Sequence, residues 1–365
     1  MDRQLIVVTG AAGFLGSAVT ADLCRDHRVV AVDRRRPAPA LRRMSEAAVW
    51  WQVDIADRRA VGSLMRRVSE ALGRIDLVIH FAAFYHFGTD WRPEYQRVNV
   101  LGTRHVLESA AACGVRRVIF ASSVAAVEPQ AGGAITERTP AEGRIPYARS
   151  KALGERMVRA ISGRLPGIVL RIAGVFSGWC ELPPLASLMR LWGGRSAAAR
   201  LVAARGETGM PYIHRQDLVR IVRACAERHA RLPAYEVLLA SPHGTVRHRE
   251  LFAAIRRACR GEQAPRPIPV SPTTARLGLL LRWGLGLFTG CEPYEQPWML
   301  RYIDRPWVTD TRHTRRMLQW DCTPGLGLLD CLPAMAERFR LDRHRWERLN
   351  RMREQRRYQF HPDDD

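Results

Sequence analysis

The chain has 365 residues, of which 47% are hydrophobic and 25% are charged, as in an ordinary globular protein. This length is too great for one small core and predicts a large domain with a smaller one beside it. The net charge of +21 is spread along the chain as arginine and is not confined to the basic segment 335–357. No nucleic-acid-binding motif accompanies it, so we expect no nucleic-acid partner. We interpret the charge as a solvated surface, or as attraction to an anionic ligand or membrane surface.

The eight cysteines form no CxxC pair and do not combine with histidines at zinc-ligand spacing. We therefore expect reduced, mostly buried thiols and no metal, as in a cytoplasmic protein. A glycine-rich loop begins directly after Thr9, so we expect no signal peptide before it. No apolar run reaches the length of a membrane span.

The first predicted element is a buried parallel strand at 5–9 (LIVVT), followed by the loop GAAGFLG and a helix to about residue 24. Glycines at such a turn let the backbone approach a pyrophosphate, which rests on the helix N-terminus. A second strand at 28–32 ends in Asp33, where an acid accepts the ribose hydroxyls of NAD. Arg34 and the two arginines after it could instead hold the 2′-phosphate of NADP. Because the acid repels that phosphate, the pattern favours NAD.

Strands and long helices continue to alternate: we predict strands at 49–55, 76–82 and 117–121, and helices at 57–72 and 93–113. This alternation predicts an α/β fold with a doubly wound parallel sheet. The fifth strand ends in Ser122 and Ser123. Ligands of such sheets bind beyond the carboxyl ends of the strands, so a hydroxyl group here lies on the cofactor side.

Lys151 is the only lysine in the chain, and it follows Tyr147 by four residues. On a helix this spacing places both side chains on one face. An ammonium close to a phenol favours the phenolate, and such a tyrosine can exchange a proton with an alcohol or a ketone. The same spacing is common on exposed helix faces, but the upstream glycine loop and serines favour a catalytic pair.

Several motifs occur in a characteristic order: TGAAGFLG (9–16), HFAA (80–83), NVLGT (99–103), SSV (122–124) and YARSK (147–151). They resemble the extended short-chain dehydrogenase/reductase family, also called the NAD-dependent epimerase/dehydratase family. The similarity is strong over residues 1–175. It implies a Rossmann-like domain built from 1–175 plus about 211–243 and a smaller mixed substrate domain from 176–210 and 244–330. A basic C-terminal helix and tail would follow at 331–365.

The resemblance implies a role for each matching residue. Tyr147 would move the proton, Lys151 would bind the nicotinamide ribose, and Ser123 would hydrogen-bond the substrate oxygen in preference to Ser122. Tyr147 and Lys151 would share the cofactor site with Gly10, Gly13, Phe14, Leu15, Gly16, Asp33, Arg34, Asp54, Ile55, Phe81, Ala82, Ala83 and Asn99. Asn99 could instead tie its helix to the neighbouring strand.

Departures from the family pattern bear on the substrate. Nucleotide-sugar members typically end the sixth strand, here 170–176, with an asparagine and a YGPR-like turn, where this chain has Ala173 and Val175. The loop FYHFGTDW (84–91) is rich in aromatic residues, which either pack the joint between domains or face the site. In the site they would suit an apolar ligand. The candidate substrate contacts are Phe84, Tyr85, His86, Ala173 and Val175.

Three later segments concern partners. Residues 264–272 are a proline-rich stretch that predicts an extended linker. The leucine-rich run 277–288 predicts a helix, either buried in the smaller domain or lying on a membrane surface. A helix at 335–357 is expected to dock on its own protein or on a second subunit. The proline-rich stretch, the leucine-rich run and the later segment DTRHTRRML (310–318) also resemble, more weakly, the hydroxysteroid dehydrogenase/isomerase branch of the family.

We therefore predict an NAD(P)-dependent oxidoreductase acting on a secondary alcohol or ketone, with a sterol-like or long-chain substrate. The alternative within enzymes is a nucleotide-sugar epimerase or dehydratase. A non-catalytic dinucleotide-binding regulator is the alternative of another class. The resemblance also implies a homodimer, and we expect a cytoplasmic location with peripheral membrane contact left open.

Overall fold

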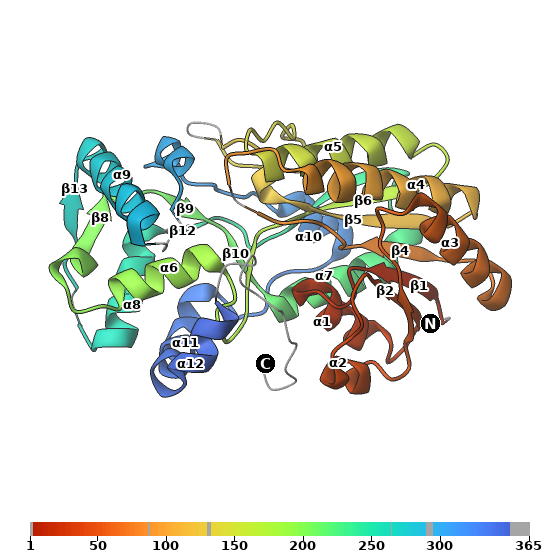
Figure 1. Ribbon diagram of the computed structural model, residues 1–365, viewed down its shortest axis with the longest axis horizontal. Coiled ribbons are helices and arrows are strands. Elements are labelled where there is room, and N and C mark those ends of the chain that lie inside the picture. The colour runs from red at the N-terminus through yellow and green to blue at the C-terminus, as the bar shows by residue number, and fades with distance from the viewer. Residues whose placement is uncertain (1–2, 87, 130–132, 264, 290–294, 351–365) are drawn as a thin grey trace.

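The computed structural model describes residues 3–86, 88–129, 133–263, 265–289 and 295–350. A seven-stranded sheet in the order β11-β6-β5-β4-β1-β2-β3 forms its centre (Figure 1). Every pairing in this sheet is parallel, so the predicted α/β fold with a doubly wound parallel sheet is confirmed. The strands are β1 (Leu5–Thr9), β2 (Arg28–Asp33), β3 (Val49–Gln52), β4 (Leu77–His80), β5 (Arg117–Ser123), β6 (Gly167–Ile172) and β11 (Tyr235–Ala240).

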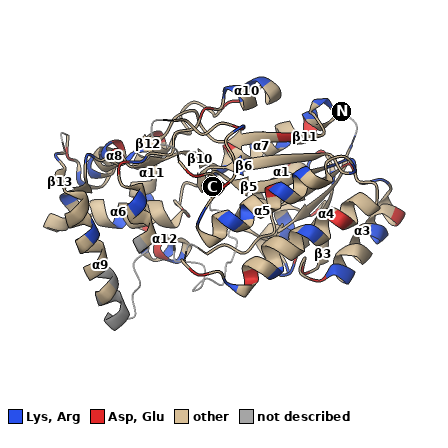
Figure 2. Cartoon of the chain, turned by 90° about the horizontal axis from the view of Figure 1, so that it is seen from above, with Lys and Arg blue, Asp and Glu red and all other residues tan. Residues whose placement is uncertain are grey.

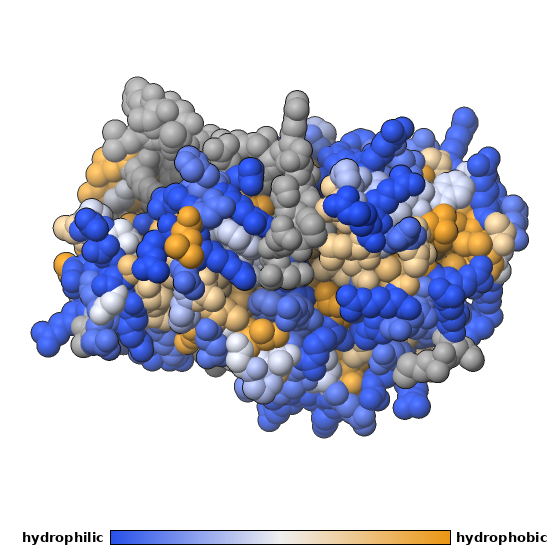
Figure 3. All heavy atoms as spheres, turned by 90° about the horizontal axis from the view of Figure 1, so that it is seen from below, coloured by the Kyte–Doolittle hydropathy of each residue, from blue (hydrophilic) through white to orange (hydrophobic). Residues whose placement is uncertain are grey.

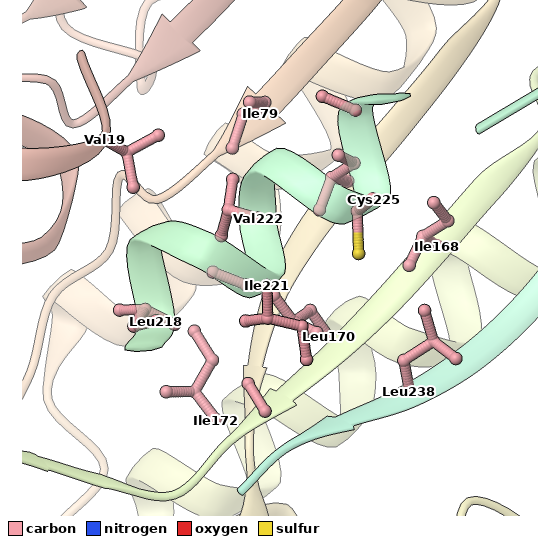
Figure 4. Packing of buried hydrophobic residues seen from close by; sticks show 14 of the residues in the cluster. Val19, Ile79, Ile168, Leu170, Ile172, Leu218, Ile221, Val222, Cys225 and Leu238 are labelled. Atoms are coloured by element: carbon pink, nitrogen blue, oxygen red, sulfur yellow. The ribbon is translucent and has the colours of Figure 1, made fainter. Parts of the chain in front are cut away.

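Helices cover both faces of this sheet, and its central strands are mainly apolar because they are buried on both sides. In β1, Ile6 and Val8 join the hydrophobic cluster on one face, whereas Leu5 and Val7 join the cluster on the other. Figure 4 shows α7 packing on the first face through Leu218, Ile221 and Val222. The helices of the first face are α1 (Phe14–Leu23) and α7 (Arg215–Arg228), and those of the second are α3 (Arg58–Leu72), α4 (Thr103–Ala112) and α5 (Pro146–Ile161).

The winding of the sheet reverses between β1 and β4. From β1 the chain proceeds outward to β2 and β3, and from β4 it proceeds in the other direction to β5 and β6. Ligands of open α/β sheets bind in the crevice at such a point, beyond the carboxyl ends of the strands. The loops that follow Thr9 and His80 lie at this position.

A smaller domain extends from one end of the sheet and has its own hydrophobic cluster, which includes Trp192, Phe252, Met335 and Trp346. Its helices are α6 (Pro183–Trp192), α8 (His248–Arg260), α9 (Pro272–Thr289), α11 (Leu328–Leu341) and α12 (Arg343–Leu349). Three two-stranded sheets pair β7 (Gly174–Phe176) with β10 (Tyr212–His214), β9 (Gly209–Met210) with β12 (Val246–Arg247), and β8 (Leu201–Ala203) with β13 (Ile268–Val270).

The remaining elements are short or connect the others. They are α2 (Pro39–Met44), the π-helix η1 (Tyr95–Gly102), α10 (Arg312–Leu318), and the 3₁₀ segments η2 (Val124–Ala126), η3 (Ala197–Arg200), η4 (His229–Arg231) and η5 (Pro297–Tyr302). Each cysteine that the structure describes is a free thiol, buried or half-buried. Within the same residues, no group of histidine, cysteine and acidic side chains is placed to hold a metal ion.

Four sequence predictions need correction. The strand at 170–176 is broken at Ala173, because β7 leaves the main sheet to pair with β10. The third strand ends at Gln52 instead of Ile55. The expected linker contains a strand, β13, whose proline is tolerated because the two-stranded sheet has free edges. The fourth strand, predicted at 76–82, spans only Leu77–His80.

The predicted C-terminal helix consists of two helices, α11 and α12, separated at Asp342, which caps α12 through its side chain. Met335, Trp346 and Leu349 are buried in the cluster of the smaller domain. The expectation that this segment docks on its own protein is therefore confirmed for residues up to 350. The remainder of the predicted tail, 351–365, lies outside the described residues.

Basic side chains are distributed over both domains, as the net charge predicted (Figure 2). Hydrophilic side chains cover most of the face in Figure 3, and hydrophobic ones reach that surface in smaller groups. None of the helices among the described residues has the length and apolar character needed to cross a bilayer.

Acid is expected to destabilise the fold through His80, which is buried at the end of β4 between Thr9 and Thr103. Burial, followed by the nearby charge of Lys151, lowers the pKa of His80 from 6.5 to about 3. Below pH 6.5 the unfolded chain binds a proton that folded His80 rejects, so stability is lost as the pH falls toward about 3. Urea unfolding at several pH values gives the free energy of unfolding as a function of pH. This free energy should change with pH more steeply in the parent than in His80→Gln, by ~1.4 kcal/mol per pH unit. Equal slopes would contradict the assignment.

Candidate active site

The loop between β1 and α1 is shaped by its glycines. Gly10 has a φ of +73°, and a Cβ atom there would lie 2.6 Å from the backbone nitrogen of Ala82. A Cβ atom at Gly16 would lie 2.2 Å from the carbonyl oxygen of Gly10. The N-terminus of α1, which begins at Phe14, has no side-chain cap and no acidic residue in its first turn. Its backbone N–H groups therefore suit an anion, and the loop fits the pyrophosphate of a dinucleotide.

Asp33 lies behind this loop at the end of β2. Its carboxylate accepts hydrogen bonds from the backbone nitrogens of Ala12 (3.0 Å) and Arg35 (2.9 Å). The Arg35 guanidinium lies 3.4 Å from the same carboxylate and also donates to the carbonyl oxygen of Ala12. Arg34, the arginine predicted to bind the cofactor, has its carbonyl oxygen bonded to Gln52. Arg35 is therefore the arginine that partly compensates the charge of Asp33.

Replacing Asp33 with serine is expected to weaken NAD binding by about tenfold or more, because a charged acceptor for the ribose hydroxyls is lost. NADP binding should improve relative to NAD, since the carboxylate no longer repels a 2′-phosphate and Arg35 is released. Titration of both cofactors against the purified variant measures the ratio. Asp57→Ser, at the N-cap of α3, is the control. An unchanged NAD to NADP ratio in Asp33→Ser would show that Asp33 does not select the cofactor.

The other predicted cofactor residues follow the carboxyl ends of β3 and β4. Asp54 accepts a hydrogen bond from the nitrogen of Ala56 and pairs with Arg97 at 3.0 Å. Ile55 is buried against Gly102, where a Cβ atom would lie 2.8 Å from its side chain. Phe81, Ala82 and Ala83 follow β4 and are half-buried.

Tyr147 and Lys151 lie on the buried face of α5, which begins at Pro146. The Lys151 ammonium donates to the carbonyl oxygen of Ala121 in β5 at 2.7 Å. The Tyr147 ring stands edge-on to the ring of Tyr85, with centroids 4.8 Å apart. One turn beyond Lys151, Gly154 faces the Phe120 ring, where a Cβ atom would lie 2.3 Å from its Cζ. This glycine allows α5 to approach β5 closely and brings the pair to the carboxyl end of that strand.

The two serines at the end of β5 point in different directions, as neighbours in a strand do. Ser122 is buried, and its hydroxyl donates to Oε1 of Glu155 at 2.5 Å. Ser123 is half-buried, and its oxygen accepts from the backbone nitrogen of Ala125 at 3.2 Å. The Ser122 hydroxyl is therefore bonded in the interior, whereas Ser123 lies half-buried at the carboxyl end of β5, and its role toward the substrate oxygen stays a prediction.

Asn99 makes structural hydrogen bonds, and its part in the reaction stays a prediction. It lies buried in the π-helix η1, and its amide bonds both the nitrogen (2.7 Å) and the oxygen (2.9 Å) of Phe84. The same amide nitrogen donates to Ser150, which in turn donates to the carbonyl oxygen of Tyr147. Asn99 therefore joins the loop after β4 to the helix of the proposed catalytic pair. π-Helical turns of this kind frequently occur at functional sites.

Some aromatic residues of the loop after β4 contact the candidate active site, and others pack in the interior. Tyr85 contacts Tyr147, whereas Phe84 and Trp91 pack around the buried ring of Tyr95. His86 stacks on Phe84, and its carbonyl oxygen accepts from the Tyr95 hydroxyl. Phe87 lies outside the described residues.

Ala173 and Val175, also proposed as substrate contacts, are buried with the main sheet's cluster. The break that follows β6 turns both of them into this interior. Their side chains therefore contact other residues of the hydrophobic core. Among the proposed substrate contacts, Tyr85 is the one whose ring contacts Tyr147.

Sequence reasoning missed the buried ion pair behind the site. The Arg171 guanidinium of β6 lies 2.8 Å from the Glu155 carboxylate of α5, and both side chains are 4% exposed. Glu155 follows Lys151 by four residues, so the helical spacing that identified Tyr147 also predicts an acid on the same face. That signal was available in the sequence.

A glycine loop at the reversal of a parallel sheet and an acid ending the next strand are features of a dinucleotide-binding fold, and this chain also carries a tyrosine and a lysine on one helix face. The chain belongs to the NAD dependent epimerase/dehydratase family, whose profile matches residues 6–240. The predicted family and its NAD cofactor are thereby confirmed, and so is the expectation of an enzyme at the level of the family.

The comparisons also identify individual similar proteins. The chain is 35% identical to sterol demethylase protein B of Methylococcus capsulatus over 188 residues, or 49% of this chain and 54% of the relative. It is 30% identical to UDP-glucose 4-epimerase of Bacillus subtilis over 163 residues, which are 42% of this chain and 47% of the relative. The chain thus spans about half the length of the curated relatives it matches. The solved structure of MoeE5 with UDP-glucuronic acid and NAD superposes with a TM-score of 0.65 at 25% identity, covering 92% of this chain and 98% of that one.

Proposed function

We propose that the chain is an NAD-dependent dehydrogenase or reductase that interconverts a secondary alcohol and a ketone. The observation that carries this proposal is the position of Tyr147 and Lys151, which are buried on the face of α5 that meets β5. NAD, when bound, supplies or accepts the hydride.

The side chains of the chain handle the oxygen and the proton of the substrate. Tyr147 donates a proton to the ketone oxygen, or removes one from the alcohol, as the hydride is transferred. The Lys151 ammonium favours the phenolate and contributes a positive charge next to the ribose of the cofactor. Ser123 donates a hydrogen bond that holds the substrate oxygen in position.

A hydrophobic substrate is the choice that the lining of the site supports. Tyr85 presents an aromatic ring directly beside Tyr147, and such surfaces suit an apolar ligand better than a sugar diphosphate. The similarity to sterol demethylase protein B over half the chain supports the same choice. We therefore propose a sterol-like or long-chain alcohol or ketone.

Nucleotide-sugar epimerisation or dehydration is the second candidate, because MoeE5 was solved with UDP-glucuronic acid and NAD at 25% identity. That chemistry begins with the same tyrosine-assisted oxidation. A purely regulatory dinucleotide-binding protein is less well supported, because such a protein has no need of the buried Tyr147 and Lys151.

The three candidates separate in one assay. The purified chain is incubated with NAD and, in turn, a 3-hydroxysterol, a long-chain secondary alcohol and UDP-glucose, while NADH absorbance and sugar products are followed. Our proposal expects NADH to accumulate with an apolar alcohol. Conversion of the sugar without net NADH would replace it with the epimerase, and NAD binding without any turnover would favour the regulator. The homodimer and the cytoplasmic location stay predictions, and light scattering tests the first.

A further inference from the structure

β8, β13 and α9 lie together at one end of the smaller domain (Figure 1), and hydrophobic side chains of all three are exposed. Leu201, Ile268, Leu277, Leu280 and Leu281 account for five of the ten large hydrophobic side chains that are exposed among the described residues. Ile268 pairs with Leu201 across the small sheet, and α9 begins shortly after β13 ends. Contiguous exposed apolar surface on a folded domain marks a site of interaction.

The leucines of α9 share one face of the helix. Leu277, Leu280 and Leu281 follow the i, i+3, i+4 spacing, and they are 59%, 51% and 61% exposed. Figure 2 shows α9 standing out from the body of the smaller domain. The sequence had left two positions open for this helix, buried or on a membrane surface, and these three side chains are not buried. We call them the α9 leucine face.

The charge around this face is entirely basic in sequence. Between residues 263 and 291 the chain has three arginines and no aspartate or glutamate. Two of these arginines, Arg266 and Arg276, are exposed beside the hydrophobic residues. The whole chain carries a net charge of +21, so a second copy approaching this face would meet charge of the same sign. An anionic lipid surface offers both the opposite charge and an apolar interior.

We propose that the α9 leucine face binds the surface of a membrane that contains anionic phospholipids. The helix lies in the plane of the headgroups with its leucines inserted toward the acyl chains, while Arg266 and Arg276 contact lipid phosphates and carboxylates. Binding is peripheral, in keeping with the lack of a bilayer-crossing helix among the described residues. The proposal needs no assumption about the substrate, although a membrane is also where a sterol-like substrate would be found.

The test is co-sedimentation of the full chain with two kinds of vesicle, phosphatidylcholine alone and phosphatidylcholine with about 30% phosphatidylserine. We expect the parent protein to sediment with the anionic vesicles and to be released by salt. The double variant Leu277→Glu/Leu281→Glu should bind them about tenfold or more weakly, because two charges would enter the apolar region. Both substituted side chains are exposed, so the fold should be retained, and circular dichroism and NAD binding check that it is.

The matched control is Met44→Glu/Val49→Glu, which makes the same change of charge at two exposed positions of the large domain. It should bind anionic vesicles within about twofold of the parent. If both double variants lose vesicle binding equally, the effect comes from net charge alone and the proposal is wrong. The proposal is also wrong if the parent protein stays in the supernatant. A parent dimer that Leu277→Glu/Leu281→Glu converts to monomer would assign this face to a second copy instead. The vesicle assay contains no substrate, so its outcome is independent of the proposed reaction.

Discussion

Tyr147→Phe is expected to reduce kcat by about a thousandfold while changing NAD affinity far less. The phenol is the proposed proton carrier, whereas the phenylalanine ring keeps the edge-on contact with Tyr85 at the same place. Steady-state kinetics with the substrate found in the assay above give kcat, and titration of the variant with NAD gives the affinity. A variant that keeps normal turnover would exclude the proposed mechanism.

Two further variants separate the proton transfer from packing. Tyr85→Phe retains the aromatic contact and should change kcat by less than about tenfold, because its hydroxyl has no assigned role in the reaction. Lys151→Met should weaken NAD binding and move the pH of half-maximal activity upward, since the ammonium that favours the phenolate is gone. Lys151→Arg should not restore activity, because a broad guanidinium does not fit where the ammonium meets the carbonyl oxygen of Ala121.

The large domain could be predicted closely from the sequence, because buried parallel strands are short, wholly apolar runs. β1 and β2 begin and end at the residues expected, and Asp57 caps α3 at the predicted start. The glycine loop could be predicted for a related reason. Its residues are fixed by local backbone contacts, such as the close approach of Gly10 to Ala82, and so they leave a compact pattern in the sequence.

Contacts between distant segments could not be predicted in the same way. Apart from Arg171, the run LRIAGVF is apolar on both sides of Ala173, so its local pattern does not show that β7 leaves the sheet to pair with β10. Neighbouring aromatic residues have nearly the same local pattern, yet Tyr85 meets Tyr147 and Phe84 meets Tyr95. In each case the deciding partner lies on another element.

The buried pair of Arg171 and Glu155 should contribute strongly to stability, and Arg171→Met tests this. The Arg171 guanidinium also donates to the carbonyl oxygens of Thr139 (2.7 Å) and Thr136 (3.3 Å), in the segment that leads to α5. Glu155 accepts from Ser122 as well. This one pair therefore connects β5, β6, α5 and the segment before it.

Arg171→Met is expected to lower the free energy of unfolding by about 3–5 kcal/mol, because it leaves the Glu155 carboxylate buried without its cation. Urea unfolding near neutral pH measures the change. Arg58→Met is the matched control, since it removes an arginine from an ion pair with Glu108 in which the two side chains are 76% and 47% exposed. Exposed pairs contribute little, so this control should unfold as the parent does.

The double variant Glu155→Leu/Arg171→Met shows whether Arg171→Met loses stability because the Glu155 charge is left unpaired or because packing is lost. Removing both charges leaves neither group unpaired, so most of the stability lost in Arg171→Met should return. If the double variant is as unstable as Arg171→Met, the hydrogen bonds to Thr136 and Thr139 carry the effect instead of the ion pair. Activity adds a second measure: the pair supports the helix of Tyr147 and Lys151, so kcat should fall in Arg171→Met and recover with the double variant.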